Sequence, residues 1–157
     1  MNLLAAIRPD DWGLPLFIHV LGASVLVGGL VTAMSFQVLA WRGRDRADLT
    51  SFDRAGLWAL LAVALPGWIV MRLGGEWIYS EEGWTGDDDP AWLGIGFVTA
   101  DTGIVLLLVA IVLAGLGARR LRRGAATNML GRIATPLTLL LLVAYLVAVW
   151  AMTAKPD

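Results

Sequence analysis

The chain has 157 residues, enough for one domain, and carries a net charge of -1. Hydrophobic residues make up 58% of it and charged residues 16%, whereas an average soluble domain has roughly 45–50% and about 25%. The apolar residues gather in four long blocks with the charges between them, which indicates an integral membrane protein. There is no basic patch outside the short loops, so nucleic-acid binding is not supported, and the lack of cysteine excludes disulfides, zinc–thiolate sites and iron–sulfur clusters.

Each of the four apolar blocks is long enough to cross a bilayer core about 30 Å thick, which needs roughly 20 residues in a helix. They cover residues 14–41, about 55–80, about 91–118 and 133–154. Because the connections are short, we expect an all-α, up-down-up-down bundle of four transmembrane helices, forming one domain over residues 1–157. Pro66, in the second block, cannot donate to the carbonyl of Ala62 and predicts a kink there.

The arginines predict the orientation of this bundle. They gather in the loops after the first and third blocks: Arg42, Arg44, Arg46, Arg54, Arg119, Arg120, Arg122, Arg123 and Arg132. The loop between the second and third blocks, residues 81–90, is acidic and has no basic residue. Since positive loops stay in the cytoplasm, we expect both termini on the outer side of a bacterial inner membrane. Tryptophans are expected near the outer interface at Trp12, Trp77, Trp84, Trp92 and Trp150, and near the inner one at Trp41.

Four ionisable residues lie inside the predicted spans, all in the outer half: His19, Arg72, Glu76 and Asp101. Such groups are costly in lipid and often mark functional sites. Arg72 and Glu76 share one face of their helix by their i, i+4 spacing, and Asp101 lies at nearly the same depth on the next span. We expect Arg72 to pair with Asp101, with Glu76 as a second acceptor. The cluster is either functional or only a link between helices.

His19 is the only histidine, and it is a candidate ligand for haem or a metal ion as well as a proton acceptor. One histidine can supply one axial ligand of a haem. Met152 on the fourth span also lies near the outer surface, so that a His–Met pair is conceivable. The alternative is a histidine that is hydrogen-bonded to a neighbouring helix. The methionines form no Met-x-x-Met cluster, which argues against a copper relay of thioethers.

Small residues form a stripe on the first span, which predicts close packing against another helix. The stripe contains Gly22, Gly29 and Ala33, with Ser24 and Gly28 beside it. No Gly-rich phosphate loop, His-Glu-x-x-His sequence or nucleophile elbow is present, so no catalytic residue is assigned and a hydrolytic or phosphotransfer enzyme is disfavoured.

The segment Phe17–Gly29 resembles the "LHVLGAxxxVGG" start of a family of small bacterial membrane proteins of unknown function with four helices. The segments Ala100–Gly103 and Ala151–Pro156 resemble later motifs of that family. The first-helix pattern is also distantly similar to the CopD copper-resistance proteins and the HemJ-type protoporphyrinogen oxidases, in which a first-helix histidine is important. This resemblance implies a role for His19. The only lysine here is Lys155, which departs from the HemJ type.

Three functions follow as hypotheses. The first is an electron-transfer or accessory membrane subunit with an outer polar pocket, occupied by haem b or a metal ion and lined by His19, Arg72, Glu76, Asp101 and Met152. The second is a CopD-like protein that handles or transports copper. The third is a purely structural subunit of a larger complex. Under each hypothesis, the expected partners of the chain are the lipid bilayer and either further copies of the chain or another membrane subunit.

Overall fold

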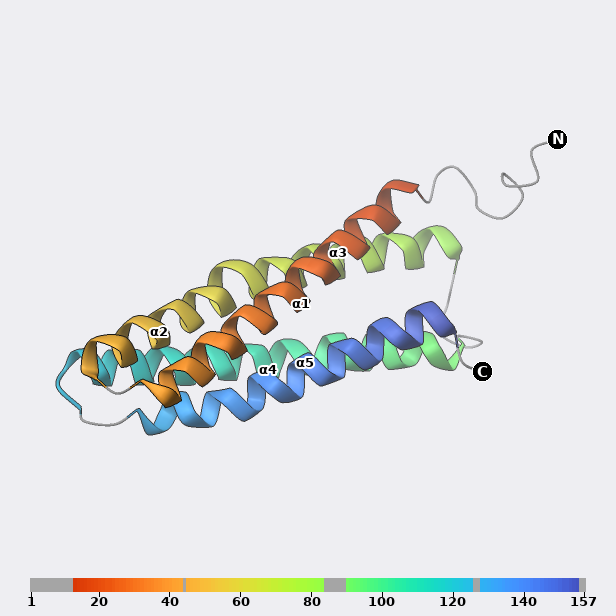
Figure 1. The fold of residues 1–157 in the computed structure, drawn as a ribbon. Coiled ribbons are helices and arrows are strands. Elements are labelled where there is room, and N and C mark those ends of the chain that lie inside the picture. The colour runs from red at the N-terminus through yellow and green to blue at the C-terminus, as the bar shows by residue number, and fades with distance from the viewer. Residues whose placement is uncertain (1–12, 44, 84–89, 126–127, 156–157) are drawn as a thin grey trace.

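A computed structural model describes residues 13–43, 45–83, 90–125 and 128–155 (Figure 1). In these ranges the chain is almost entirely helical and has no strand. The helices in chain order are α1 (Gly13–Arg42), α2 (Arg46–Ala59), the π-helical η2 (Leu60–Ala64), α3 (Leu65–Glu82), α4 (Ala91–Arg122) and α5 (Met129–Ala154). Because α2, η2 and α3 follow one another without a break, the described chain has four helices long and apolar enough to cross a membrane. The predicted four-helix membrane bundle is confirmed.

Local caps set the helix ends, and they extend two helices beyond the apolar blocks. The Asp45 side chain accepts a 2.8 Å hydrogen bond from the backbone nitrogen of Asp48, so α2 begins well before residue 55. The Asn128 side chain does the same for the nitrogen of Gly131 at 2.8 Å, and α5 begins before residue 133. At the end of α3, Gly83 adopts a φ of 69°, a left-handed conformation that glycine reaches without strain.

The four long helices run antiparallel (Figure 1). One end of the bundle holds the start of α1, the end of α3, the start of α4 and the end of α5; we call it the acidic-loop end. The opposite end is the arginine end, defined by Arg42, Arg119, Arg120, Arg122 and Arg132. Trp12, Trp84 and residues 85–89 of the acidic loop lie outside the described residues.

Glycines on both helices bring α1 and α3 into direct backbone contact. Gly22 lies against the backbone of Met71, and a Cβ on Gly29 would lie 2.7 Å from the nitrogen of Ala64. From the other side, a Cβ on Gly67 would lie 2.5 Å from the nitrogen of Leu26, and one on Gly74 would lie 2.5 Å from that of His19. The packing role predicted for Gly22 and Gly29 is confirmed, whereas Gly28 has no atom near its missing Cβ.

The second long helix changes its hydrogen bonding just before Pro66. Over Leu60–Ala64 it forms a π-helical turn, and the nitrogen of Leu65 donates to the carbonyl of Leu60. Since Pro66 has no N–H, the carbonyl of Ala62 loses its α-helical donor, and a π turn is a common way for a helix to accommodate such a break. The structure therefore has a π turn directly before Pro66, and the kink predicted there stays a prediction.

The helices pack as two pairs, α1 with α3 and α4 with α5. The pairs are joined through α1 with α5 and α2 with α4, whereas α3 and α4 have few backbone contacts. Leucines fill the core at Leu26, Leu30, Leu60, Leu107 and Leu141. Many large apolar side chains, including Phe17, Leu73 and Val98, point outward instead, as expected of a surface that faces lipid tails.

Candidate functional site

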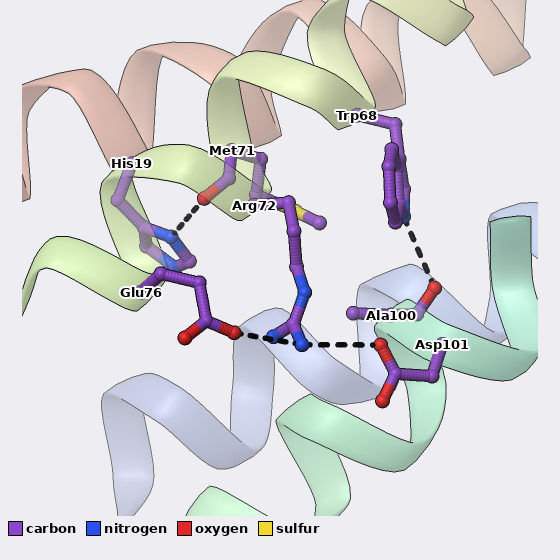
Figure 2. Close-up of polar contacts among 7 residues, drawn as sticks. All are labelled: His19, Trp68, Met71, Arg72, Glu76, Ala100 and Asp101. Atoms are coloured by element: carbon purple, nitrogen blue, oxygen red, sulfur yellow. Dashed lines mark hydrogen bonds and ion pairs between the residues drawn. The ribbon is translucent and has the colours of Figure 1, made fainter. Parts of the chain in front are cut away.

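Arg72 lies between α3 and α4 and contacts both predicted acidic partners (Figure 2). Its Nη2 is 2.7 Å from Oε1 of Glu76 on the same helix and 3.3 Å from Oδ1 of Asp101 on α4. The predicted pairing of Arg72 with Asp101 is thereby confirmed, although the contact with Glu76 is the shorter one. A charged group inside a span is stabilised when opposite charges share its site.

Aromatic side chains add further contacts between α3 and α4, whose backbones have few contacts with each other. The guanidinium carbon of Arg72 lies 4.8 Å from the centre of the Phe97 ring, within reach of a cation–π contact. Tyr79 meets Phe97 edge to face at 5.2 Å between ring centres. The indole nitrogen of Trp68 donates a 3.1 Å hydrogen bond to the carbonyl of Ala100 (Figure 2). Side chains therefore connect α3 to α4 at this level.

The charged cluster of Arg72, Glu76 and Asp101 is open toward the side of the bundle. Arg72 has 25% of its side-chain surface exposed, but Glu76 has 49% and Asp101 has 63%. The arginine is thus largely covered by the protein, while both carboxylates have a free side. The cluster is a lateral surface site, and its exposed chemistry is that of hydrogen-bond and ion-pair acceptors.

His19 lies on α1 and contacts α3. Its Nδ1 is 2.8 Å from the carbonyl oxygen of Met71, so Nδ1 carries the hydrogen and donates it (Figure 2). The ring is close to Gly75, where a Cβ would lie 3.1 Å from Nδ1. His19 is thus hydrogen-bonded to a neighbouring helix, whereas its binding of haem or a metal ion stays a prediction. In the neutral form of such a ring the lone pair lies on Nε2, so that nitrogen is the one able to bind a metal.

Met152, the second predicted ligand, contacts a different helix from His19. Its terminal methyl group packs against Gly96 of α4, while His19 packs against Met71 and Gly75 of α3. The two side chains therefore lie on different helix pairs. Among the described residues no group of three His, Asp or Glu side chains could hold a metal ion.

A polar pocket at the arginine end was not predicted. Asp53 was assigned to a loop, but α2 carries it into the bundle, where only 6% of it is exposed, beside Gln37 with 4%. The bundle therefore has buried polar groups at the arginine end, in addition to the ionisable residues predicted near its other end. The sequence holds one signal: Asp53 and Gly56 continue, at helical spacing, the buried stripe of Leu60 and Ala64.

Comparison with known proteins gives no match among protein-family models, curated proteins or solved structures.

Proposed function

We propose that this chain is an accessory subunit of the bacterial cytoplasmic membrane that binds a second membrane protein through the cluster of Arg72, Glu76 and Asp101. The arginine end lies in the cytoplasm in this proposal, by the rule that positive loops stay inside, and the cluster lies in the outer half of the membrane. The observation that carries the proposal is the exposure of Glu76 and Asp101 on a surface otherwise rich in apolar side chains.

Contact with lipid tails is unfavourable for the carboxylates of Glu76 and Asp101. An uncompensated charge at the centre of a membrane helix costs at least about 2.5–3.5 kcal/mol even on insertion scales. When ionised, the cluster contains one positive and two negative groups, and its positive group is the most covered of the three. A partner helix with a basic side chain at this depth would neutralise the excess negative charge and shield it from lipid.

The distribution of basic residues favours a different chain over a second copy as the partner. Within the described residues, the acidic-loop half of this chain offers Arg72 and Lys155 as permanently charged basic groups. Arg72 is already held between two carboxylates, and the ammonium group of Lys155 lies 4.9 Å from the centre of the Trp92 ring beyond the end of α5. Within the described residues, a second copy therefore has no uncommitted basic side chain to place against Asp101, and Arg8 lies outside those residues.

A photo-crosslinking amino acid at Val98 tests the proposal, because this exposed residue lies one turn before Asp101 on α4. In native membranes we expect one adduct with another protein, and we expect it to disappear when Asp101→Asn and Glu76→Gln are added. The same probe at Val112, exposed on α4 toward the arginine end, is the matched control and should not give this adduct. Adducts with lipid alone, or a protein adduct that survives the double substitution, would contradict the proposal.

Haem binding through His19 is the second candidate. The observation in its favour is the hydrogen bond from Nδ1 to the carbonyl of Met71, since a histidine that binds a metal usually donates its other N–H to a carbonyl or carboxylate, which fixes the ring. The resemblance of the first helix to the CopD and HemJ-type proteins supports the same residue. His19 would hold the iron through Nε2, and a bound haem would supply one-electron chemistry.

The absorption spectrum of the protein purified from haem-replete cells tests this candidate. We expect a Soret band that is lost in His19→Ala and unchanged in Met152→Leu, because Met152 packs on a different helix. No Soret band in the unsubstituted protein, or a band that persists in His19→Ala, would rule out haem ligation by His19.

A further inference from the structure

A pocket of about 140 Å³ opens at the arginine end, far from the cluster around Arg72. Three helices line it: α1 with Gln37, Ala40 and Trp41, α2 with Leu49 and Asp53, and the start of α5 with Asn128, Gly131 and Arg132. Gly131 allows Asp53 to come close to α5, because a Cβ there would lie 2.8 Å from Oδ1 of Asp53. The exposed lining residues Trp41 and Arg132 place the mouth of the pocket on the surface of the bundle.

Buried polar atoms in this pocket lack partners in the described part of the chain. Both amide atoms of Gln37 and Oδ2 of Asp53 are inaccessible and make no hydrogen bond there. Asp53 is hydrogen-bonded to the side chain of Asn128, whose Oδ1 caps α5. Since buried polar groups are nearly always paired in native proteins, we expect an occupant of the pocket to draw these side chains toward it and to donate hydrogen bonds to Asp53 and Gln37.

The charges of the lining residues specify the occupant further. A carboxylate lies inside, at Asp53, and a guanidinium lies at the exposed rim, at Arg132. A zwitterion whose cation points inward and whose anion stays at the rim would satisfy both. A primary ammonium group fits the inner part, because its three N–H groups can reach several acceptors, and a phosphate fits an arginine at the rim.

The position of the pocket indicates that this zwitterion belongs to a lipid. Gln37 lies about 7–8 Å from the end of α1 at 1.5 Å per residue, and Trp41 is a residue type that favours the interface between membrane and water. A water molecule needs roughly 10–15 Å³ of cavity volume, so the pocket is large enough for several waters. It is therefore also large enough for a small headgroup. We propose that this pocket binds the headgroup of a phosphatidylethanolamine lipid, with its ammonium at Asp53 and Gln37 and its phosphate at Arg132.

Thermal unfolding of the purified protein in detergent, with added lipid, tests the proposal. Phosphatidylcholine with the same acyl chains is the matched ligand, because it keeps the charges but its nitrogen has no N–H. We expect phosphatidylethanolamine to raise the Tm and to bind at least tenfold more tightly than phosphatidylcholine, as read independently by mass spectrometry of the intact complex. Equal shifts with the two lipids, or no shift with either, would overturn the proposal.

Substitutions assign the effect to the pocket. Gln37→Leu replaces a buried amide that lacks partners with an apolar side chain of similar length, so it should fold and should lose the preference for phosphatidylethanolamine. Arg132→Gln should weaken the binding of both lipids. Arg122→Gln is the control at the same end, since Arg122 does not line the pocket, and it should keep the preference.

Two further outcomes count against the proposal. A preference that survives in Gln37→Leu, together with unchanged binding of both lipids in Arg132→Gln, would place the lipid elsewhere on the protein. Soluble phosphoethanolamine that gives the same stabilisation as the lipid would show that the occupant is a small solute. In either case the proposed role of the Arg72 cluster would stand, because it depends on residues at the opposite end.

Discussion

Arg72 links α3 to α4, two helices that have few backbone contacts with each other. It reaches Glu76 on α3, Asp101 on α4 and the face of Phe97 on α4. A side chain with three partners on two helices has its position fixed, and its own charge is compensated. The two carboxylates are in a different situation, because each keeps an exposed side that Arg72 does not cover.

A double-mutant cycle on Arg72→Gln and Asp101→Asn measures the strength of this link. Polar pairs between membrane helices contribute about 0.6 kcal/mol on average and up to about 1.7 kcal/mol, and we expect a coupling within that range. The measurement is the free energy of unfolding in mixed micelles. Thr102, exposed beside Asp101, serves as control, and the cycle of Arg72→Gln with Thr102→Ala should give no coupling. A coupling for Asp101 no larger than that for Thr102 would contradict the ion pair.

At the scale of helices, the sequence predicted the elements well and their ends less well. Apolar length defined four spans, and neighbouring depth on two spans was enough to pair Arg72 with Asp101. The start of α2 depends instead on the cap at Asp45, which lies among charged residues that were assigned to a loop. That one displaced boundary concealed Asp53, and with it the pocket at the arginine end.

The rotation of a helix about its axis was the other feature that the sequence could not provide. His19 meets the carbonyl of Met71 only because α1 and α3 approach through Gly22 and Gly74. The small-residue stripe predicted a close approach of α1 to some helix, but it did not identify α3. Met152 was predicted near the same depth as His19, but it packs against α4, whereas His19 packs against α3.

Alanine substitutions on α1 test the close packing of α1 with α3. Gly22→Ala would push a methyl group into the backbone of Met71, and overpacking of this kind typically costs about 1–3 kcal/mol. Gly28→Ala is the matched control, because its Cβ would meet no atom and alanine favours a helix over glycine by about 1 kcal/mol. We expect thermal unfolding in detergent to show a lower Tm for Gly22→Ala and an unchanged or higher Tm for Gly28→Ala. Equal effects of the two substitutions would argue against this helix pairing.

At the scale of the whole molecule, two polar regions lie at opposite ends of an apolar bundle. The arginine end contains a pocket with unpaired polar atoms, and the other half contains an ion cluster that is open to the side. The surface between them is rich in exposed leucine, valine and isoleucine. The proposal for the Arg72 cluster places it in the outer half of the membrane, and so it depends on the orientation of the bundle, with the arginine end in the cytoplasm and the acidic-loop end outside.

Cysteine labelling in intact cells tests that orientation directly. The chain has no cysteine of its own, so a single introduced thiol reports one position. Ser80→Cys marks the acidic-loop end and Ala47→Cys marks the arginine end, and both residues are exposed near a helix terminus. With a maleimide that does not cross the membrane, we expect Ser80→Cys to be labelled in intact cells and Ala47→Cys only after permeabilisation. The reverse pattern would contradict the proposed orientation and would place the Arg72 cluster in the inner half of the membrane.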